Sequence, residues 1–160
     1  QTCALPIYSS MSNMSNHTKV LVLNGPNLAR LDIRDHSHYG DLNWDQLKNL
    51  IHSAAKDLGF EADVRQSDDE ATLVGWLHEA ADSQIPVIIN PAAFTHYSIA
   101  IHDAAEMVKA PLIEVHLSNP LAREEFRHTS VISGVAKGTI SGFGPNSYVL
   151  ALHALKSLAK

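Results

Sequence analysis

The chain has 160 residues, of which 45% are apolar, with a net charge of −5 at neutral pH and a pI near 6.0. This length suffices for one buried core but not for two, so we expect a single domain over residues 19–160. The acidic balance, without any run of lysine or arginine, argues against nucleic acid or an anionic membrane as a partner. No apolar stretch is long enough to cross a bilayer, so a small molecule is the expected substrate.

Residues 1–18 do not have the basic segment and long apolar run of a signal peptide, and we expect a disordered tail here. Met11 and Met14 are both candidate start residues, which leaves residues 1–10 as a candidate non-native extension. The only cysteine, Cys3, lies in this tail. A single cysteine excludes an intrachain disulfide or a thiolate metal cluster within the chain, and it fits a reducing compartment such as the cytoplasm.

The first predicted element of the domain is a buried strand over residues 20–23, where Val-Leu-Val-Leu has no polar alternation. Asn24-Gly25 ends it, and a polar loop of about fifteen residues follows, a length that is uncommon and usually functional. The next predicted element is a helix over residues 44–58. Asn43 and Gln46 form a capping pair at its start, and a glycine follows its end.

The same alternation continues to the end of the chain. Strands are predicted at 60–66, 86–89, 112–115 and, more weakly, 135–140, with helices from about 70 and 98 and an apolar helix at 148–159. Asn119-Pro120 predicts a further short helix that carries Arg123 and Arg127 on one face. Alternating strands and helices favour a flavodoxin-like, doubly wound α/β domain with a five-stranded parallel sheet of order 2-1-3-4-5.

In such a fold, the carboxyl ends of strands one, three and four meet at one edge of the sheet, where ligands bind. These ends carry Asn27, Asn90 with His96 beyond it, and His116. A single asparagine after a strand is most often a turn former, and a lone histidine is most often a surface or core residue. Their convergence with Tyr39 and several arginines predicts a catalytic site.

Longer motifs lie on the same strand ends: NGPNLARL at 24–31 with Arg34 and Tyr39-Gly40 after it, NPAAFTHYSIAIHD at 90–103, and EVHLSN and AREEFR within 114–127. In this order and spacing they resemble the type II 3-dehydroquinate dehydratases over residues 19–158. The resemblance implies an anti elimination, through an enolate, that converts 3-dehydroquinate to 3-dehydroshikimate in aromatic biosynthesis or quinate breakdown. It also implies a dodecamer built from trimers, without a cofactor or metal.

The resemblance assigns proton abstraction to Tyr39, with Arg34 as its activator. A free tyrosine titrates near pH 10, so ionising one at pH 7 costs about 4 kcal/mol. A guanidinium about 4 Å away supplies a similar energy at an effective dielectric constant near 20. His116, oriented by Glu114, is implied to protonate the departing hydroxyl. Asn27 is implied to hold the water or the enolate oxygen.

Other residues are implied by the resemblance to bind the hydroxyls and carboxylate of the substrate: Asn90, His96, the main-chain amides of Leu117 and Ser118, and Arg127. Asp103 lies too far along its helix to face its own site, and in the family this position reaches the site of a neighbouring subunit. Arg30 is interpreted as a solvated loop residue. Arg123 is interpreted as a structural or inter-subunit ion-pair partner.

Several residues depart from the family pattern. Asp32 replaces a glycine, Asp35-His36 replaces Glu-Pro, and His102 replaces an arginine; Pro120-Leu121 and Ser147 are also atypical. Glycine permits positive φ and proline stiffens a loop, so the first two changes predict altered loop order and affinity before altered chemistry. Asp35 is also a candidate competitor for the guanidinium group of Arg34.

Two other functions fit parts of the sequence. A metal-dependent hydrolase would use His36, His38, His96 and His116, although no nearby carboxylate has convincing ligand spacing. A non-catalytic flavodoxin-like binding or signalling module would use residues 142–147 as a phosphate loop. The glycine pattern of that segment is incomplete, which favours a tight strand-to-helix turn instead.

Overall fold

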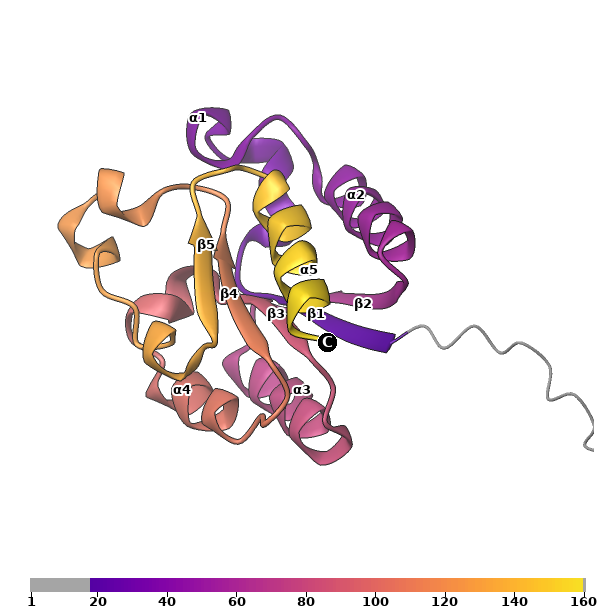
Figure 1. Cartoon of the computed structure of the whole chain (residues 1–160). Coiled ribbons are helices and arrows are strands. Elements are labelled where there is room, and N and C mark those ends of the chain that lie inside the picture. Colours follow the sequence, from indigo (N-terminus) through magenta and orange to yellow (C-terminus); the bar gives the residue numbers. More distant parts are fainter. Residues whose placement is uncertain (1–17, 160) are drawn as a thin grey trace, which may run out of the picture.

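The sheet has five parallel strands in the order β2-β1-β3-β4-β5, as predicted (Figure 1). The computed structural model describes residues 18–159, so the predicted tail, apart from Thr18, lies outside the described residues. Because all strands run parallel, their carboxyl ends lie at one edge of the sheet. The strands are β1 (Thr18–Asn24), β2 (Phe60–Gln66), β3 (Val87–Asn90), β4 (Leu112–His116) and β5 (Gly138–Ser141).

Two helices cover each face of the sheet (Figure 1). Strand β1 alternates its side chains between the two layers: Val20 and Val22 pack on one side, and Leu21 and Leu23 on the other. Burial on both faces explains why this strand is apolar without alternation. The helices are α2 (Trp44–Asp57) and α5 (Asn146–Leu158) on one face, and α3 (Glu70–Ser83) and α4 (Ile99–Glu106) on the other.

Side-chain caps set the starts of α2, α3 and α4. The Asn43 side chain accepts from the Gln46 amide at 2.9 Å, and the Gln46 side chain accepts from the Asn43 amide at 3.0 Å, which completes the predicted capping box. Asp69 accepts from the Thr72 amide at 3.0 Å at the start of α3, and Ser98 caps α4. Among residues 18–159, no helix is long and apolar enough to span a membrane.

The polar loop after β1 contains short helices that were not predicted. A 3-10 helix covers Leu28–Ile33, and a one-turn helix, α1, covers His36–Tyr39. The apolar side chains that anchor this loop, Leu28, Leu31 and Tyr39, are buried against the α2/α5 layer. Three anchors with irregular spacing do not produce a helical period, which explains why the sequence pattern missed these turns.

The last third of the chain differs from the prediction in its boundaries. The short helix predicted after Asn119 is instead two 3-10 turns, Pro120–Ala122 and Glu125–Arg127. Strand β5 covers Gly138–Ser141 rather than 135–140, and α5 begins at Asn146 rather than at residue 148. As an edge strand with exposed and half-buried residues, β5 has a weak sequence signal.

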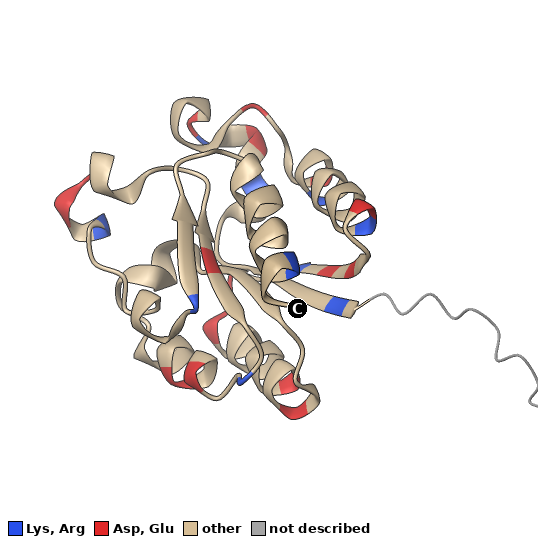
Figure 2. Ribbon diagram, in the orientation of Figure 1, with Lys and Arg blue, Asp and Glu red and all other residues tan. Residues whose placement is uncertain are grey.

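Charged residues lie mainly on the helices, the connecting loops and the edge strand β2, but one acidic band also crosses the middle of β4 (Figure 2). This band is Glu114, the only acidic residue of the strand, and it is 1% exposed. A buried carboxylate is costly unless hydrogen bonds or a cation compensate for the lost water. Glu114 therefore directs attention to the carboxyl end of β4.

Candidate active site

A pocket opens at the carboxyl edge of the sheet, beside the ends of β1, β3 and β4. The ends of β1 and β3 lie close together, and the Gly25 amide donates to the Asn90 carbonyl at 2.8 Å. A Cβ on Gly25 would lie 2.4 Å from the Pro91 oxygen. Only glycine permits this approach. Nine of the ten predicted site residues line the pocket: Asn27, Arg34, Tyr39, Asn90, His96, His116, Leu117, Ser118 and Arg127.

Tyr39 is the last residue of α1 and is 8% exposed. Its hydroxyl accepts hydrogen bonds from Nη2 of Arg34 and, at 2.7 Å, from Nη1 of Arg123. The Arg34 guanidinium also lies 3.6 Å from the centroid of the Tyr39 ring. Burial, reinforced by the charges of Arg123 and Arg127, lowers the pKa of Arg34 despite the opposing attraction of Tyr39. Positive charge is thus concentrated around one phenol oxygen.

Arg123 lies in this pocket, a position that the sequence did not predict. Its Nε atom also lies 3.7 Å from Oε2 of Glu124, so an ion pair of the kind that the sequence predicted is present within the chain. Its side chain is 10% exposed, and Nη1 also lies 3.3 Å from the Ser118 hydroxyl. The backbone of Arg123 is extended between the two 3-10 turns (φ −113°, ψ −161°), which separates it from Arg127. A continuous helix would have placed both arginines on one face, so the sequence carried no signal for this arrangement.

His116 ends β4 and is oriented by Glu114, as predicted. The Nε2 atom of His116 lies 2.6 Å from Oε2 of Glu114. The other carboxylate oxygen of Glu114 accepts from the hydroxyls of Ser130 at 2.9 Å and Ser133 at 3.1 Å. These serines return from a later loop, and no spacing in the sequence links them to Glu114. The imidazole is therefore held by a carboxylate that is itself fixed.

Asn27 and Asn90 follow two adjacent strands. Asn27 has a left-handed backbone (φ 69°), which asparagine tolerates. Its main-chain amide donates to the Asp68 side chain at 2.9 Å. The Asn90 side chain accepts from the Ala92 amide at 3.2 Å and donates to the Tyr148 hydroxyl at 2.9 Å. Ala92 is also left-handed (φ 52°), a strained conformation for alanine. Local hydrogen bonds thus hold the backbone of both pocket segments.

His96 and Arg127 are both half-buried in the pocket and are held by the loop after β4. His96 donates from Nδ1 to the Thr129 carbonyl at 2.8 Å, and Arg127 donates from Nε to Glu124 at 2.7 Å. Together with Arg34 and Arg123, Arg127 gives this small pocket three guanidinium groups. Such a site suits an anionic ligand, because guanidinium groups form strong charge-assisted hydrogen bonds with carboxylates.

The atypical acidic residues of the loop before α2 make local contacts. Asp35 accepts from the amide of Ser37 at 2.9 Å and from its hydroxyl at 2.7 Å, and thereby caps α1. Both contacts use Oδ1, and Oδ2 lies 3.8 Å from Nε2 of His38, so Asp35, which the sequence suggested as a competitor for Arg34, contacts neighbours in its own turn instead. Asp32 pairs with Arg30 at 3.1 Å, and both side chains are largely exposed, in agreement with the prediction that Arg30 is solvated.

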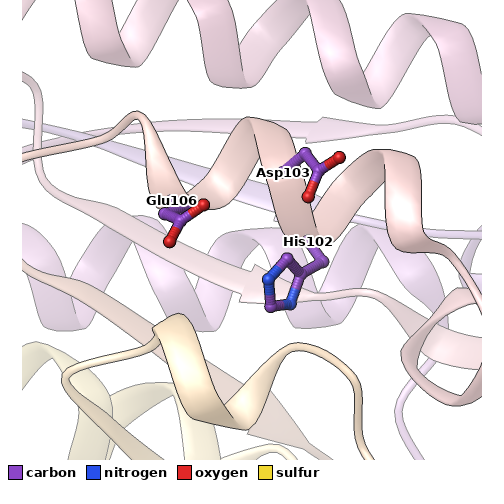
Figure 3. Close-up of side chains that lie close together, drawn as sticks. All are labelled: His102, Asp103 and Glu106. Carbon is purple, nitrogen blue, oxygen red and sulfur yellow. The ribbon is translucent and has the colours of Figure 1, made fainter.

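Asp103 is exposed on α4 and does not line the pocket, as predicted for its own subunit. It forms a group with His102 and Glu106 whose potential ligand atoms all lie within 4.8 Å of one another (Figure 3). His102 also donates from Nδ1 to the Val131 carbonyl at 2.6 Å. Within the described part of the chain, no other group has this geometry, and none of the four histidines proposed for a metal hydrolase belongs to it.

The segment considered as a phosphate loop forms the turn between β5 and α5. Gly142 and Gly144 have positive φ values of 94° and 57°. The Gly144 amide donates to the Leu117 carbonyl at 2.9 Å, and the Phe143 amide donates to the Ser147 hydroxyl at 3.2 Å. The amides of Gly142 and Ser147 also donate, to the carbonyls of His116 and Gly144, so four amides of this segment are used within the fold. This arrangement agrees with the tight turn that the sequence favoured. It also gives the atypical Ser147 a structural contact.

Comparison with known proteins identifies relatives along nearly the whole domain. The profile of the family described as dehydroquinase class II matches residues 18–156. The 3-dehydroquinate dehydratase of Salinispora tropica is 53% identical over 142 residues, which cover 89% of this chain and 99% of that protein. The residues matched by the family profile, 18–156, include all the strands and all the pocket segments described above.

Two solved structures have the same fold. The type II dehydroquinase of Propionibacterium acnes is 50% identical, with a TM-score of 0.85 over 88% of this chain and 99% of that chain. The type II dehydroquinase of Butyrivibrio crossotus is 42% identical, with a TM-score of 0.84 over 87% of this chain and 97% of that chain. The chain therefore belongs to the class II dehydroquinase family.

Proposed function

We propose that the chain dehydrates 3-dehydroquinate to 3-dehydroshikimate, with Tyr39 as the base and His116 as the acid. The observation that carries this proposal is the convergence, in one pocket, of a tyrosine contacted by two guanidinium groups and a histidine paired with a buried carboxylate. A β-elimination next to a ketone needs a base at the α carbon and an acid at the departing hydroxyl. Membership of the family supports the identity of the substrate.

In the first step, the ionised oxygen of Tyr39 takes a proton from the carbon next to the ketone. The electron pair of the broken C–H bond forms the double bond of an enolate, and negative charge develops on the former carbonyl oxygen. Nearby cations favour the charged form of a phenol. A guanidinium at about 4 Å contributes about 4 kcal/mol at an effective dielectric constant near 20. The attraction from Arg34 or Arg123 alone is thus about as large as the cost of ionising a tyrosine at pH 7. The second arginine compensates for the screening by solvent in an open pocket.

In the second step, the carbonyl re-forms and the electron pair of the enolate double bond becomes the new carbon–carbon double bond. The bond to the β-hydroxyl breaks, and His116 donates a proton so that water departs. Asn27 lines the pocket, and its side chain is proposed to hydrogen-bond the enolate oxygen or the leaving water.

The substrate is a polyhydroxylated carboxylate, and the remaining pocket residues match its donors and acceptors. Arg127 supplies a charge-assisted contact for the carboxylate or a ring hydroxyl. The residues proposed to bind the substrate are Asn90, His96, the main-chain amides of Leu117 and Ser118, and Arg127. The catalytic pair, Tyr39 and His116, provides both proton transfers, so the proposed mechanism uses no cofactor or metal.

We also propose that the active enzyme is an oligomer built from trimers, of dodecameric size, in which Asp103 completes the pocket of a neighbouring subunit. Tyr97, Ile99 and Met107, on or beside α4, are 61%, 58% and 53% exposed. Exposed apolar groups of this size often mark contact surfaces. Sedimentation velocity should show one large species, and a fully active monomer would contradict this proposal.

The decisive experiment is a direct assay of the purified chain with 3-dehydroquinate, following the ultraviolet absorbance of the conjugated enone. We expect turnover that persists in the presence of a chelator. Absence of turnover would reject the assigned reaction, and loss of turnover with the chelator would favour the metal-dependent alternative. Nucleotide binding by calorimetry without turnover would favour the non-catalytic module.

A further inference from the structure

A buried chain of hydrogen bonds lies behind the pocket and joins β1, α5 and β3. The hydroxyl of Tyr148 donates to Oδ1 of Asn24 at 2.6 Å and accepts from Nδ2 of Asn90 at 2.9 Å. Asn24 and Tyr148 are fully buried and Asn90 is 3% exposed. Of these three residues only Asn90 lines the pocket, so Asn90 is the direct link between Tyr148 and a bound substrate.

The direction of each hydrogen bond in this chain is fixed from the β1 end. Nδ2 of Asn24 lies 3.0 Å from the Arg65 carbonyl and 3.3 Å from the Val22 carbonyl, and carbonyl oxygens only accept. Oδ1 of Asn24 therefore faces Tyr148, whose hydroxyl must donate to it and accept from Asn90. Burial raises the pKa of Tyr148 far above its ordinary value, so the hydroxyl keeps its proton at any working pH.

The other end of the Asn90 amide is fixed as well. Its Oδ1 accepts from the amide of Ala92 at 3.2 Å, next to the left-handed backbone of that alanine. A reversed Asn90 amide would place its NH₂ group against the Ala92 N–H and its oxygen against the Tyr148 oxygen, which has no proton left to donate. Both hydrogen bonds would be lost, so the contacts at the two ends select one orientation.

We propose that Tyr148 is a positioning residue that fixes the Asn90 amide, and the turn from Asn90 to Ala92, in the orientation that binds the substrate. The kinetic consequences rest on the proposed function. Asn90 contacts the substrate in the ground state and does not move a proton in the proposed mechanism. Loss of its orientation should therefore appear in KM rather than in kcat.

Tyr148→Phe removes only the hydroxyl and tests this proposal directly. We expect KM for 3-dehydroquinate to rise about tenfold, the usual scale of one buried hydrogen bond. We expect kcat to remain within about twofold and the pH dependence of the rate to be unchanged, because Tyr39 and His116 are untouched. An unchanged KM, or a loss confined to kcat, would overturn the proposal.

A double-mutant cycle separates positioning from a general structural role. When Asn90→Ala is already present, Tyr148→Phe should cause no further rise in KM, whereas additive effects would contradict action through Asn90. Leu152→Ala is the matched control, because Leu152 lies fully buried on the same helix. It should lower the unfolding temperature without raising KM. An equal rise in KM in this control would mean that loosening of α5, rather than positioning, explains the result.

Two further measurements keep the test independent of folding and of activity. If Tyr148→Phe does not fold, Asn24→Ala replaces it: the freed hydroxyl can then donate to Oδ1 of Asn90 as well as accept from Nδ2, so only the Ala92 contact still selects the orientation, and a smaller rise in KM is expected. In NMR spectra, the Asn90 side-chain amide signals of Tyr148→Phe should shift and exchange faster with water. Unchanged signals would overturn the positioning role, whereas a wild-type protein without turnover would reject only the assigned reaction.

Discussion

The two proposed proton-transfer groups are held in different ways. Tyr39 belongs to a one-turn helix in a long loop, and two arginines from separate loops contact its hydroxyl. His116 ends a central strand and is paired with Glu114 of the same strand, whose carboxylate is fixed by hydroxyls of a later loop. The base side therefore depends on nearby charge, and the acid side on orientation by the sheet.

This difference predicts different consequences of substitution. Coulombic attraction falls off gradually with distance, so a loop can supply it without a rigid frame. Orienting an imidazole needs a hydrogen bond of defined length and angle, which a buried strand can hold. Changes on the base side should move the pH dependence of the rate. Changes on the acid side should lower the rate but leave its pH dependence unchanged.

The largest effect is expected for Tyr39→Phe, which removes the proton acceptor and keeps the ring. Turnover should fall by about 1,000-fold or more, within the range of general base catalysis. The substrate should still bind, because the pocket keeps its arginines and strand-end amides. The checks are kcat from enone absorbance and the dissociation constant from calorimetry. A rate within about tenfold of the wild type would remove Tyr39 from the mechanism.

Glu114→Gln tests the acid side. The amide oxygen can still accept from Ser130 and Ser133, which turns the NH₂ group toward His116 and removes the oxygen that orients the imidazole. We expect kcat to fall by about 100-fold, with KM and the pH dependence little changed. Ser133→Ala is the matched control, since it removes one of the two hydroxyls that contact Glu114 and should have a much smaller effect. Equal losses in both variants would contradict a specific role for the carboxylate.

Arg34→Ala and Arg123→Ala test the base side. Each removes a cation from the Tyr39 oxygen, so a higher pH is needed to ionise the base. The rate at pH 7 should fall by about 10- to 100-fold and recover as the pH rises. The lysine variants retain the charge and should lie closer to the wild type. An unchanged pH profile in Arg123→Ala would return that residue to the structural role that its sequence context suggested.

The strands and their order were predictable because their physical signal is local. The four residues at 20–23 are all apolar, which predicts a strand buried on both faces of the sheet. The alternation of strands with helices then restricts the topology to a few forms. The capping box at Asn43 and the pairing of Glu114 with His116 also involve residues only two or three apart. Patterns over such short distances are visible in a single sequence.

The missed features depend on contacts between distant segments. Arg123 reaches Tyr39 across 84 residues because two 3-10 turns replace a helix, and 3-10 turns have no extended apolar period. Tyr148 was predicted only as part of an apolar helix, although its hydroxyl links the ends of two strands. Neither contact follows from residue type or spacing. Both require the backbone positions of several loops.

The smallest effect is expected at the cap of α1. Hydrogen bonds from the hydroxyl and the amide of Ser37 lower the pKa of Asp35 below its ordinary value. A lowered carboxyl pKa means that the cap contributes stability above the unfolded pKa and loses it as the pH falls through the folded value. At pH 7 the cap is therefore ionised and fully effective, and kinetic comparisons belong there.

Asp35→Ala should raise KM at pH 7 by about threefold, because α1 loses the cap that orders the turn carrying Tyr39. Asp35→Asn retains a capping oxygen and should keep KM near the wild-type value. If Asp35 instead competed with Tyr39 for Arg34, both variants would free the guanidinium, raise the rate at pH 7 and move the rate profile to lower pH. That outcome would mean that the Asp35 carboxylate draws the Arg34 guanidinium away from the Tyr39 oxygen in solution. The contact between Arg34 and Tyr39 would then be formed for only part of the time.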